Sequence, residues 1–443
     1  MKRLMGLLLV LAILGTLVVL PVTGMTEGEK IVIEVLNWNG GTEQKRNEEA
    51  IAKYEAEHPN IDIDFQVVTD NYMAKLNTLV AADETPDIYY IAETSAIQWG
   101  LNGVALDLAE LYAADGIDMK EYFIPSALFG SGDEIYGLSY GVVNIVLYYN
   151  KALFDQYGIE YPSRDPADPI TWEEFVDTCK QLTFDFNGNT PNDEGFDEFS
   201  IATYGTMINS WFPYIDAALY SNDASFFTED GMDFAMDSEA GMEVIQALAD
   251  LCLVHKVAPS VALSQALPNS VQMMKDNQLA MMTGGSYEYP NYIDEGVDIG
   301  VAALPSFGKS RTVSWAAANE ISAKTENVDE VFDFFRWWVE PETNPLQIVS
   351  NFPNTKAFYE DEELTAQWLS NEMYNDDFKT VIPAYFTGDF SQVPEPVTTV
   401  NAAEMLDEVI MPGLDPIWTG EVSVADGLAA IRTKLEGMYG GKW

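Results

Sequence analysis

The chain has 443 residues, of which 71 are acidic and 22 basic, giving a formal net charge of −49. Its length favours two domains over a single core. The acidic excess argues against nucleic acid or an anionic membrane surface as partner, because phosphate binding requires clustered lysine and arginine. A hydrophobic content of 47%, with 10 Trp and 22 Tyr, argues against a disordered chain. The acidic residues are spread along the whole chain, which indicates a strongly hydrated surface.

The first 24 residues have the pattern of a signal peptide. Lys2 and Arg3 precede an apolar run over 4–20, which Pro21 ends, and residues suited to cleavage follow at 22–24. A membrane anchor is the alternative, but the run is short for a bilayer span and polar residues follow it at once. No cysteine lies nearby, so a lipid-modified N-terminus is not indicated. We expect a secreted protein, periplasmic or extracellular.

Cysteine and histidine are scarce. Cys179 and Cys252 could form a disulfide in an oxidising compartment or remain two buried thiols, and the sequence leaves both open. The two histidines, His58 and His255, allow no His-rich metal cluster and lie near no nucleophile motif such as Gly-x-Ser-x-Gly. A triad hydrolase or a zinc enzyme is therefore poorly supported.

Strands and helices alternate in the first hundred residues. Predicted strands over 31–36, 61–68 and 86–91 are separated by predicted helices over 43–57 and 72–82. This order predicts an α/β fold with a mostly parallel sheet covered by helices. Ligands of such sheets bind beyond the carboxyl ends of the strands, where residues 38–39 and 93–94 stand.

A second block begins near residue 142. A long strand is predicted over 142–149, and Thr171 with Glu174 forms a capping box that begins a later helix. The sequence contains no internal repeat and no low-complexity segment. The other predicted elements are helices over 151–157, 237–255, 328–339 and 424–438, and strands over 279–282 and 299–303.

Several short motifs occur in an order that resembles one protein family. The most specific are Tyr-Tyr-Asn-Lys at 148–151 and Thr-Trp-Glu-Glu at 171–174. Together with the weaker motifs they cover nearly the whole mature chain, which resembles the maltose-binding-like solute-binding proteins (family 1) of ATP-driven (ABC) sugar importers. The weaker motifs lie at 85–88, 137–140, 279–285, 303–305, 323–327 and 411–424.

The resemblance implies a two-lobed periplasmic-binding-protein fold, each lobe a mostly parallel sheet flanked by helices, with the ligand cleft between the lobes. It places the N-terminal lobe at 27–143 plus 302–345 and the C-terminal lobe at 144–301 plus 346–443. Hinge closure around the ligand would exclude water and strengthen polar contacts. The implied function is capture of a mono- or oligosaccharide by a monomer that delivers it to membrane permease subunits, with no enzymatic activity and no required cofactor.

A sugar offers hydroxyl groups and flat C–H faces, so its site needs aromatic rings and planar hydrogen-bonding groups. Trp38 follows the first strand, although a core position would suit it too. Tyr287 follows a glycine pair where the resemblance places a stacking aromatic, usually Trp in maltose binders. The expected ligand-binding residues are Trp38, Asn39, Thr42, Glu43, Glu93, Thr94, Asn144, Trp211, Ser286, Tyr287 and Trp315.

One loop resembles a calcium-binding loop, with oxygen-bearing side chains at alternate positions and an Asn-Gly turn. It departs from the EF-hand pattern, since Thr190 replaces the usual glycine and Phe196 stands where a glutamate is usual. A solvated acidic turn is the alternative, and both remain open. The candidate ligands of a structural calcium ion are Asp185, Asn187, Asn189, Asp193 and Glu194.

Two other functions remain open. A secreted carbohydrate-active enzyme would use paired carboxylates, but with 71 acidic residues some pair will always look suitable. The same fold could instead bind an amino acid, a peptide or a metal complex, each of which requires matched charges in the cleft. The candidate residues are mainly aromatic and neutral, which favours a sugar.

The signal-peptide interpretation predicts the mass of the secreted protein. Intact-mass spectrometry of secreted material should give a chain without residues 1–24. Secreted material that retains these residues would count against cleavage and favour an anchor.

Overall fold

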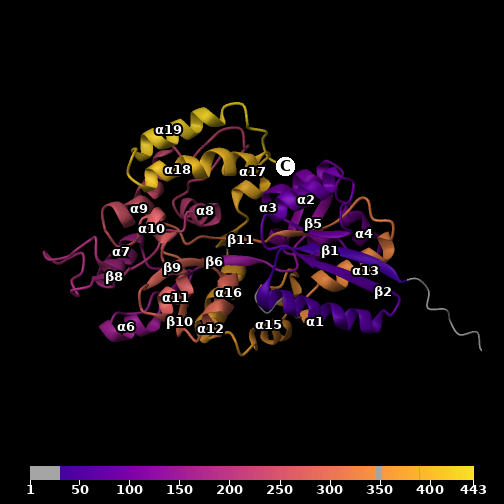
Figure 1. The fold of residues 1–443 in the computed structure, drawn as a ribbon, viewed down its shortest axis with the longest axis horizontal. Helices are drawn as coiled ribbons and strands as arrows, with labels where there is room; N and C mark the ends of the chain where they lie inside the picture. Colours follow the sequence, from indigo (N-terminus) through magenta and orange to yellow (C-terminus); the bar gives the residue numbers. More distant parts are fainter. Residues whose placement is uncertain (1–29, 346–350, 389) are drawn as a thin grey trace, which may run out of the picture.

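Two sheets, each covered by helices, form the centres of two lobes that lie side by side (Figure 1). The computed structural model describes residues 30–345, 351–388 and 390–443. The predicted signal peptide lies outside the described residues. The predicted two-lobed α/β architecture is confirmed.

The first sheet has the strand order β2-β1-β3-β12-β5-β4. The pairs β1–β2 and β1–β3 are parallel, and the remaining pairs are antiparallel. Its strands are β1 (Ile31–Asn37), β2 (Ile61–Val67), β3 (Ile88–Ile91), β4 (Leu128–Ser131), β5 (Glu134–Leu138) and β12 (Ala318–Ile321).

The second sheet has the order β10-β6-β11-β13, with β9 also paired to β6. β6 is antiparallel to each of its partners, and the pair β11–β13 is parallel. Its strands are β6 (Val143–Asn150), β9 (Met281–Gly285), β10 (Ile299–Ala302), β11 (Thr312–Trp315) and β13 (Ser391–Gln392). A separate small sheet joins β7 (Phe184–Asp185) to β8 (Ile201–Thr203).

Both sheets are therefore mixed, and the expectation of mostly parallel sheets is wrong. Strand propensity carries no information on strand direction. β12 enters the first sheet from the second lobe, and β4 and β5 form a hairpin, so these strands run antiparallel to their neighbours.

Helices cover the faces of both sheets (Figure 1). The predicted capping box at the start of α7 is confirmed: the Oγ1 of Thr171 accepts from the Glu174 amide at 3.2 Å, and the Glu174 carboxylate accepts from the Thr171 amide at 2.9 Å. The α-helices are α1 (Gly41–Glu57), α2 (Tyr72–Ala81), α3 (Glu93–Leu101), α4 (Leu108–Ala114), α5 (Met119–Tyr122), α6 (Lys151–Tyr157), α7 (Trp172–Gln181), α8 (Phe212–Ser221), α9 (Glu239–Leu253), α10 (Val261–Ser264), α11 (Ser270–Lys275), α12 (Tyr289–Asp294), α13 (Val328–Val339), α14 (Ala357–Glu360), α15 (Glu362–Leu369), α16 (Asp376–Thr387), α17 (Ala402–Glu404), α18 (Met411–Trp418) and α19 (Val424–Leu435).

Three crossing segments carry the chain between the lobes. One leads from β5 into β6, whose Val143 pairs with Trp315 of β11. The second, residues 316–317, leads from β11 to β12. The third contains Phe352 and lies beside the first, because Val142 and Phe352 exchange backbone hydrogen bonds. β11 belongs to the second sheet, so the chain returns to the first lobe at 316–317, later than the expected boundary at 302.

Both cysteines are free thiols and do not form the disulfide that the sequence left open. Cys179 lies on the buried face of α7, and Cys252 of α9 is partly exposed. In the part of the chain that the structure describes, no helix is both long and apolar enough to cross a membrane.

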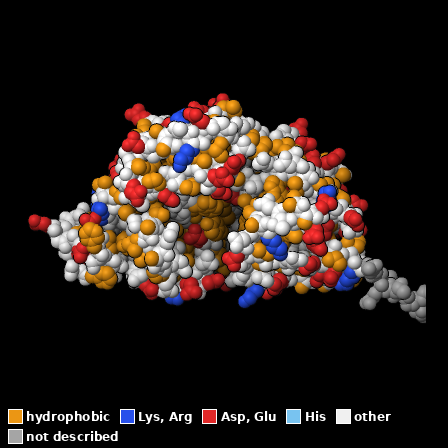
Figure 2. Space-filling model, turned by 45° about the horizontal axis from the view of Figure 1, so that its top comes forward, with side chains coloured by type: hydrophobic (Ala, Val, Ile, Leu, Met, Phe, Trp, Pro, Cys, Tyr) orange, Lys and Arg blue, Asp and Glu red, His pale blue; other side chains and the backbone are white. Residues whose placement is uncertain are grey.

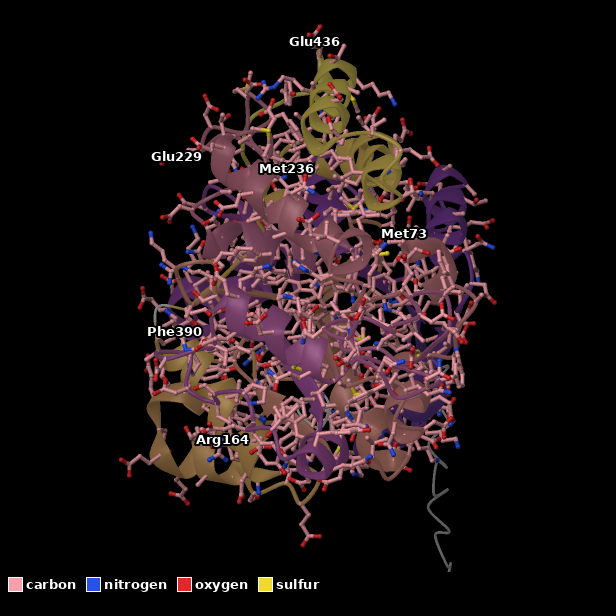
Figure 3. All side chains as sticks on the ribbon, turned by 90° about the vertical axis from the view of Figure 1, so that its left-hand side faces the viewer. Met73, Arg164, Glu229, Met236, Phe390 and Glu436 are labelled. Atoms are coloured by element: carbon pink, nitrogen blue, oxygen red, sulfur yellow. The ribbon has the colours of Figure 1, made fainter. Side chains whose placement is uncertain are left out.

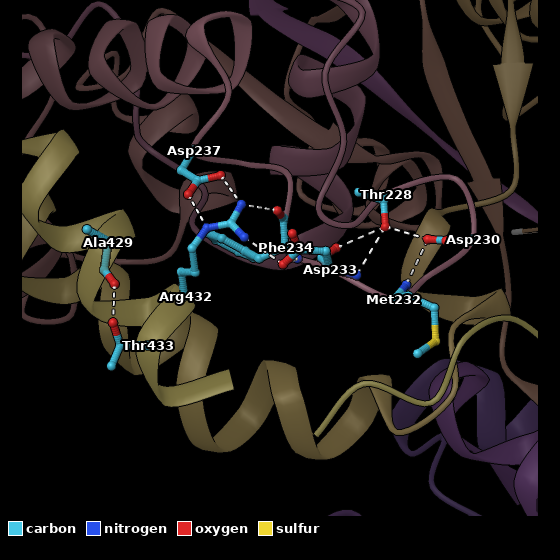
Figure 4. Close-up of polar contacts among 9 residues, drawn as sticks. All are labelled: Thr228, Asp230, Met232, Asp233, Phe234, Asp237, Ala429, Arg432 and Thr433. Atoms are coloured by element: carbon cyan, nitrogen blue, oxygen red, sulfur yellow. Dashed lines mark hydrogen bonds and ion pairs between the residues drawn. The ribbon is translucent and has the colours of Figure 1, made fainter. Parts of the chain in front are cut away.

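Many acidic side chains extend into solvent, as Glu229 and Glu436 do at the edge of the molecule (Figure 3). Others are tied by the few basic residues. Arg432 of α19 donates from Nη1 to Asp233 at 2.6 Å and from Nε and Nη2 to Asp237 (Figure 4). Its Nη2 also donates to the Phe234 carbonyl. This bidentate contact joins the C-terminal helix to the segment before α9.

Replacement of Arg432 by methionine should lower the free energy of unfolding by about 1–3 kcal/mol, because two carboxylates and a carbonyl lose their charged donor. Urea denaturation measures the loss. Lys434→Met is the control, since Lys434 is exposed on the same helix. Equal losses in the two variants would contradict the role given to Arg432.

Candidate functional site

A cavity of about 480 Å³ lies between the lobes, beyond the carboxyl ends of β1 and β3. Figure 2 shows a hollow between the two halves of the molecule, with hydrophobic side chains inside it and acidic side chains at its edge. Small-ligand sites commonly have about 300–1,000 Å³. The cavity is lined by Trp38, Asn39, Glu43, Tyr90, Ala92, Glu93, Thr94, Tyr140, Gly141, Val143, Trp211, Phe212, Tyr287, Trp315, Ala316, Ala317, Asn351, Leu406, Asp407 and Met411.

Three aromatic rings form the wall on the first lobe. The ring centroids of Trp38 and Tyr90 are 4.4 Å apart, and Tyr90 stacks on Tyr140 at 5.5 Å. Trp38 also meets the ring of Tyr72 edge-on at 5.1 Å. Packing among these rings fixes the wall before any ligand arrives.

A polar network lies beside these rings. The Glu43 carboxylate accepts hydrogen bonds from Nδ2 of Asn39 at 2.7 Å and from the Tyr140 hydroxyl at 2.6 Å. Burial, together with Glu43, raises the pKa of Tyr140 well above its usual value, so the hydroxyl keeps the proton that it donates. The network holds the α1 end of the wall in one arrangement.

Two half-exposed rings form the wall on the second lobe. Trp211, at the N-terminus of α8, is 41% exposed, and Tyr287, just after β9, is 40% exposed. Trp211 meets the buried Trp315 edge-on at 5.7 Å. Both rings line the cavity and keep part of their surface exposed.

A glycine and a buried carboxylate position Tyr287. A Cβ on Gly285 would lie 2.1 Å from the ring, so this close contact requires glycine. The Tyr287 hydroxyl lies 3.4 Å from that of Tyr214, which donates to Glu288 at 3.3 Å. Glu288 also accepts from the Gly285 amide at 3.2 Å, and burial raises its pKa to about 7.

The crossing segments supply the floor of the cavity, which consists mostly of backbone and small side chains. A Cβ on Gly141 would lie 2.6 Å from that of Asn351, so glycine permits the close approach of two crossings. The floor residues are Gly141, Val143, Ala316, Ala317 and Asn351.

Two further carboxylates reach the cavity from different elements. Glu93 is the first residue of α3, and Asp407 lies in the π-helical turn Met405–Ile410. Glu93 is 8% exposed. Burial, and to a smaller extent the charge of Asp407, raise the pKa of Glu93 to about 7, although a hydrogen bond from its own backbone amide acts in the opposite direction. Burial and Glu408 raise the pKa of Asp407.

The structure brings most of the predicted ligand-binding residues together at this cavity. Asn144 and Ser286 do not line it: both are buried, and the Asn144 amide donates to the Ser286 hydroxyl at 3.2 Å. Alternation along β6 turns Val143 toward the cavity and Asn144 away from it. The side chain of Thr42 lies outside what the structure describes. The predicted residues at the cavity are Trp38, Asn39, Glu43, Glu93, Thr94, Trp211, Tyr287 and Trp315.

Sequence reasoning missed Tyr90, Tyr140 and Asp407. Tyr90 lies in β3 close to its carboxyl end, and Tyr140 lies in the crossing segment between β5 and β6, so position relative to the strands could have found both. Asp407 gives no such signal, because it reaches the cavity only through the packing of the C-terminal helices.

Internal hydrogen bonds organise the loop that was expected to hold calcium. One Asp185 oxygen accepts from the amides of Asn187 and Asn189, and the other accepts from the Asp197 amide and the Asn189 side chain. Burial opposes the charged carboxylate, but these bonds outweigh it and lower the pKa of Asp185 to about 2. Within the described ranges, no three His, Cys, Asp or Glu side chains are grouped to hold a metal ion. Calcium binding stays a prediction.

Asp185→Ala should lower the melting temperature even in a chelator, because four donors lose their acceptor. Bound calcium would add a second effect, in which the chelator destabilises the parent and leaves the variant unchanged. Thermal unfolding of the parent and the variant, each with calcium and with chelator, separates the two effects. If the parent melts at the same temperature in calcium and in chelator, calcium binding is excluded. If the variant melts like the parent in chelator, the structural role given to Asp185 is excluded.

Comparison with known proteins identifies the family. The model of the family described as bacterial extracellular solute-binding protein matches residues 39–345, which is more than half of the chain. The chain therefore belongs to the bacterial extracellular solute-binding proteins, whose members are binding proteins.

Curated relatives match part of the chain. The arabinooligosaccharide-binding protein of Halalkalibacterium halodurans is 24% identical over 260 residues, which cover 57% of this chain and 53% of that protein. The diacetylchitobiose binding protein of Streptomyces coelicolor is 30% identical over 108 residues, 24% of each chain. The chain thus spans about half, or less, of these relatives.

Solved structures match nearly the whole chain in fold. The ABC substrate-binding protein of Listeria monocytogenes in complex with cycloalternan aligns with a TM-score of 0.77 at 19% identity, covering 92% of this chain and 99% of that one. The maltose-bound MalE3 of T. maritima aligns with a TM-score of 0.72 at 18% identity, with the same coverage. At these identities the likeness establishes the fold.

Proposed function

We propose that the chain is the secreted substrate-binding component of an ABC importer, which binds a mono- or oligosaccharide in the interlobe cavity. The observation that carries this proposal is the pair of aromatic walls. Trp38 and Tyr90 line the cavity from one lobe, and Trp211 and Tyr287 line it from the other. Aromatic faces suit the C–H faces of a sugar ring, and neutral polar groups suit its hydroxyls.

Relatives support the choice of a sugar. The matched proteins bind arabinooligosaccharide and diacetylchitobiose by name, and the aligned structures hold cycloalternan and maltose. The sugar-binding walls lie on separate lobes, so a solute between them would hold the lobes together as they close about the crossing segments.

Delivery to membrane permease subunits follows from this role, and it requires export. We expect the mature chain to act as a monomer, since one chain supplies both walls. A structural calcium ion in the loop at 185–194 would lie away from the cavity and take no part in binding.

The enzyme alternative is separable by experiment. Glu93 and Asp407 both line the cavity, and a glycosidase acts through two carboxylates. A binding protein should leave a chromogenic glycoside intact while the same sugar raises its melting temperature. Hydrolysis that is lost in Glu93→Gln would overturn the proposal.

Loss of one aromatic face should weaken binding without unfolding the protein. Tyr287→Ala should bind the sugar about 10- to 100-fold more weakly, because a platform contributes about 1–3 kcal/mol. Its melting temperature should stay within a few degrees of the parent, since the ring is already 40% exposed. Titration calorimetry and thermal unfolding measure the two effects.

Tyr287→Phe and Tyr287→Trp keep a ring and should keep most of the affinity. Tyr157→Ala removes a ring that is 45% exposed away from the cavity, and it should bind like the parent. Unchanged affinity in Tyr287→Ala would exclude Tyr287 from the site.

A further inference from the structure

The charges that line the cavity are all of one sign. Glu43, Glu93 and Asp407 contribute carboxylates, and none of the described lining residues is lysine, arginine or histidine. Residues 346–350, which precede the lining residue Asn351, carry no charge in the sequence either. A neutral solute would therefore enter a cavity that has an unbalanced negative charge.

Glu43 is accounted for within the protein, since Asn39 and Tyr140 both donate to its carboxylate. Among the residues that the structure describes, Glu93 has no such side-chain partners. It is 8% exposed, and within the described part of the chain its carboxylate has only its own backbone amide as a donor. The amide ends at the start of α3 favour one negative charge there, but burying a carboxylate with so little compensation is costly.

Asp407 increases this cost. It faces the same cavity from the C-terminal segment, and its charge is close enough to Glu93 to raise the pKa of that carboxyl group. α3 contacts α17, which directly precedes the turn Met405–Ile410 that carries Asp407. Closure around a neutral solute would bring like charges together in a drier space, where they repel more strongly.

We propose that the cavity selects a sugar that carries a protonated amino group, with the ammonium held between Glu93 and Asp407. The inference rests on the proposed function and narrows it to amino sugars. An ammonium group has only donors, which match two carboxylates, and it is also attracted to the faces of aromatic rings such as Trp38 and Tyr287. The negative field of a chain with net charge −49 would further concentrate cations at the cleft.

Three disaccharides with one linkage test this: a β-1,4-linked glucosamine dimer, its N-acetylated form and the glucose dimer. Titration calorimetry at a pH where the amine is protonated should give at least about 10-fold tighter binding of the free amine than of either neutral sugar. Glu93→Gln and Asp407→Asn, which keep the side-chain shapes, should each remove most of this preference. Glu408→Gln is the matched control, because Glu408 is an exposed neighbour of Asp407 that does not line the cavity.

The outcomes distinguish the two proposals. Equal or tighter binding of a neutral dimer would overturn the amino-sugar inference and leave sugar binding intact. A preference for the amine that survives in both carboxylate variants would also overturn it. Binding of 1,4-diaminobutane through Glu93 and Asp407, with no response to any of the three sugars, would overturn the proposed function instead.

Discussion

Three segments of chain have to pass close together between two sheets, and the geometry of the site depends on this. Gly141 permits the approach because a side chain there would collide with Asn351, and the exchange of hydrogen bonds between Val142 and Phe352 fixes two of the segments side by side. The segments are also the floor of the cavity. Any change in the angle between the lobes must therefore occur in the backbone on which a solute rests.

The two walls above this floor differ in character. On the first lobe, Trp38, Tyr90 and Tyr140 support one another, and Glu43 holds the nearest polar groups. On the second lobe, Trp211 and Tyr287 stand half-exposed. The first wall resembles a preformed surface, and the second offers rings that gain most of their burial when something lies against them.

Much of this could be read from the sequence, for identifiable reasons. Strand and helix positions follow from apolar periodicity, and Trp38 and Glu93 were found because they stand at the carboxyl ends of strands. Strand direction was not readable, since β12 arrives from the other lobe. The prediction that Asn144 contacts the ligand was wrong by one residue, because side chains alternate along β6 and Val143 points toward the cavity instead. Asp407 was beyond reach, because only tertiary packing connects a C-terminal turn to the first lobe.

The contact between Gly285 and the Tyr287 ring shows that a residue can set the shape of the cavity without lining it. Gly285 does not line the cavity, yet its missing side chain sets where the ring can lie. One methyl group at this position would move a wall of the site while every lining residue kept its identity. Ligand preference in chains of this architecture can thus drift through a residue that never meets the solute, and a comparison of lining residues alone would not detect it.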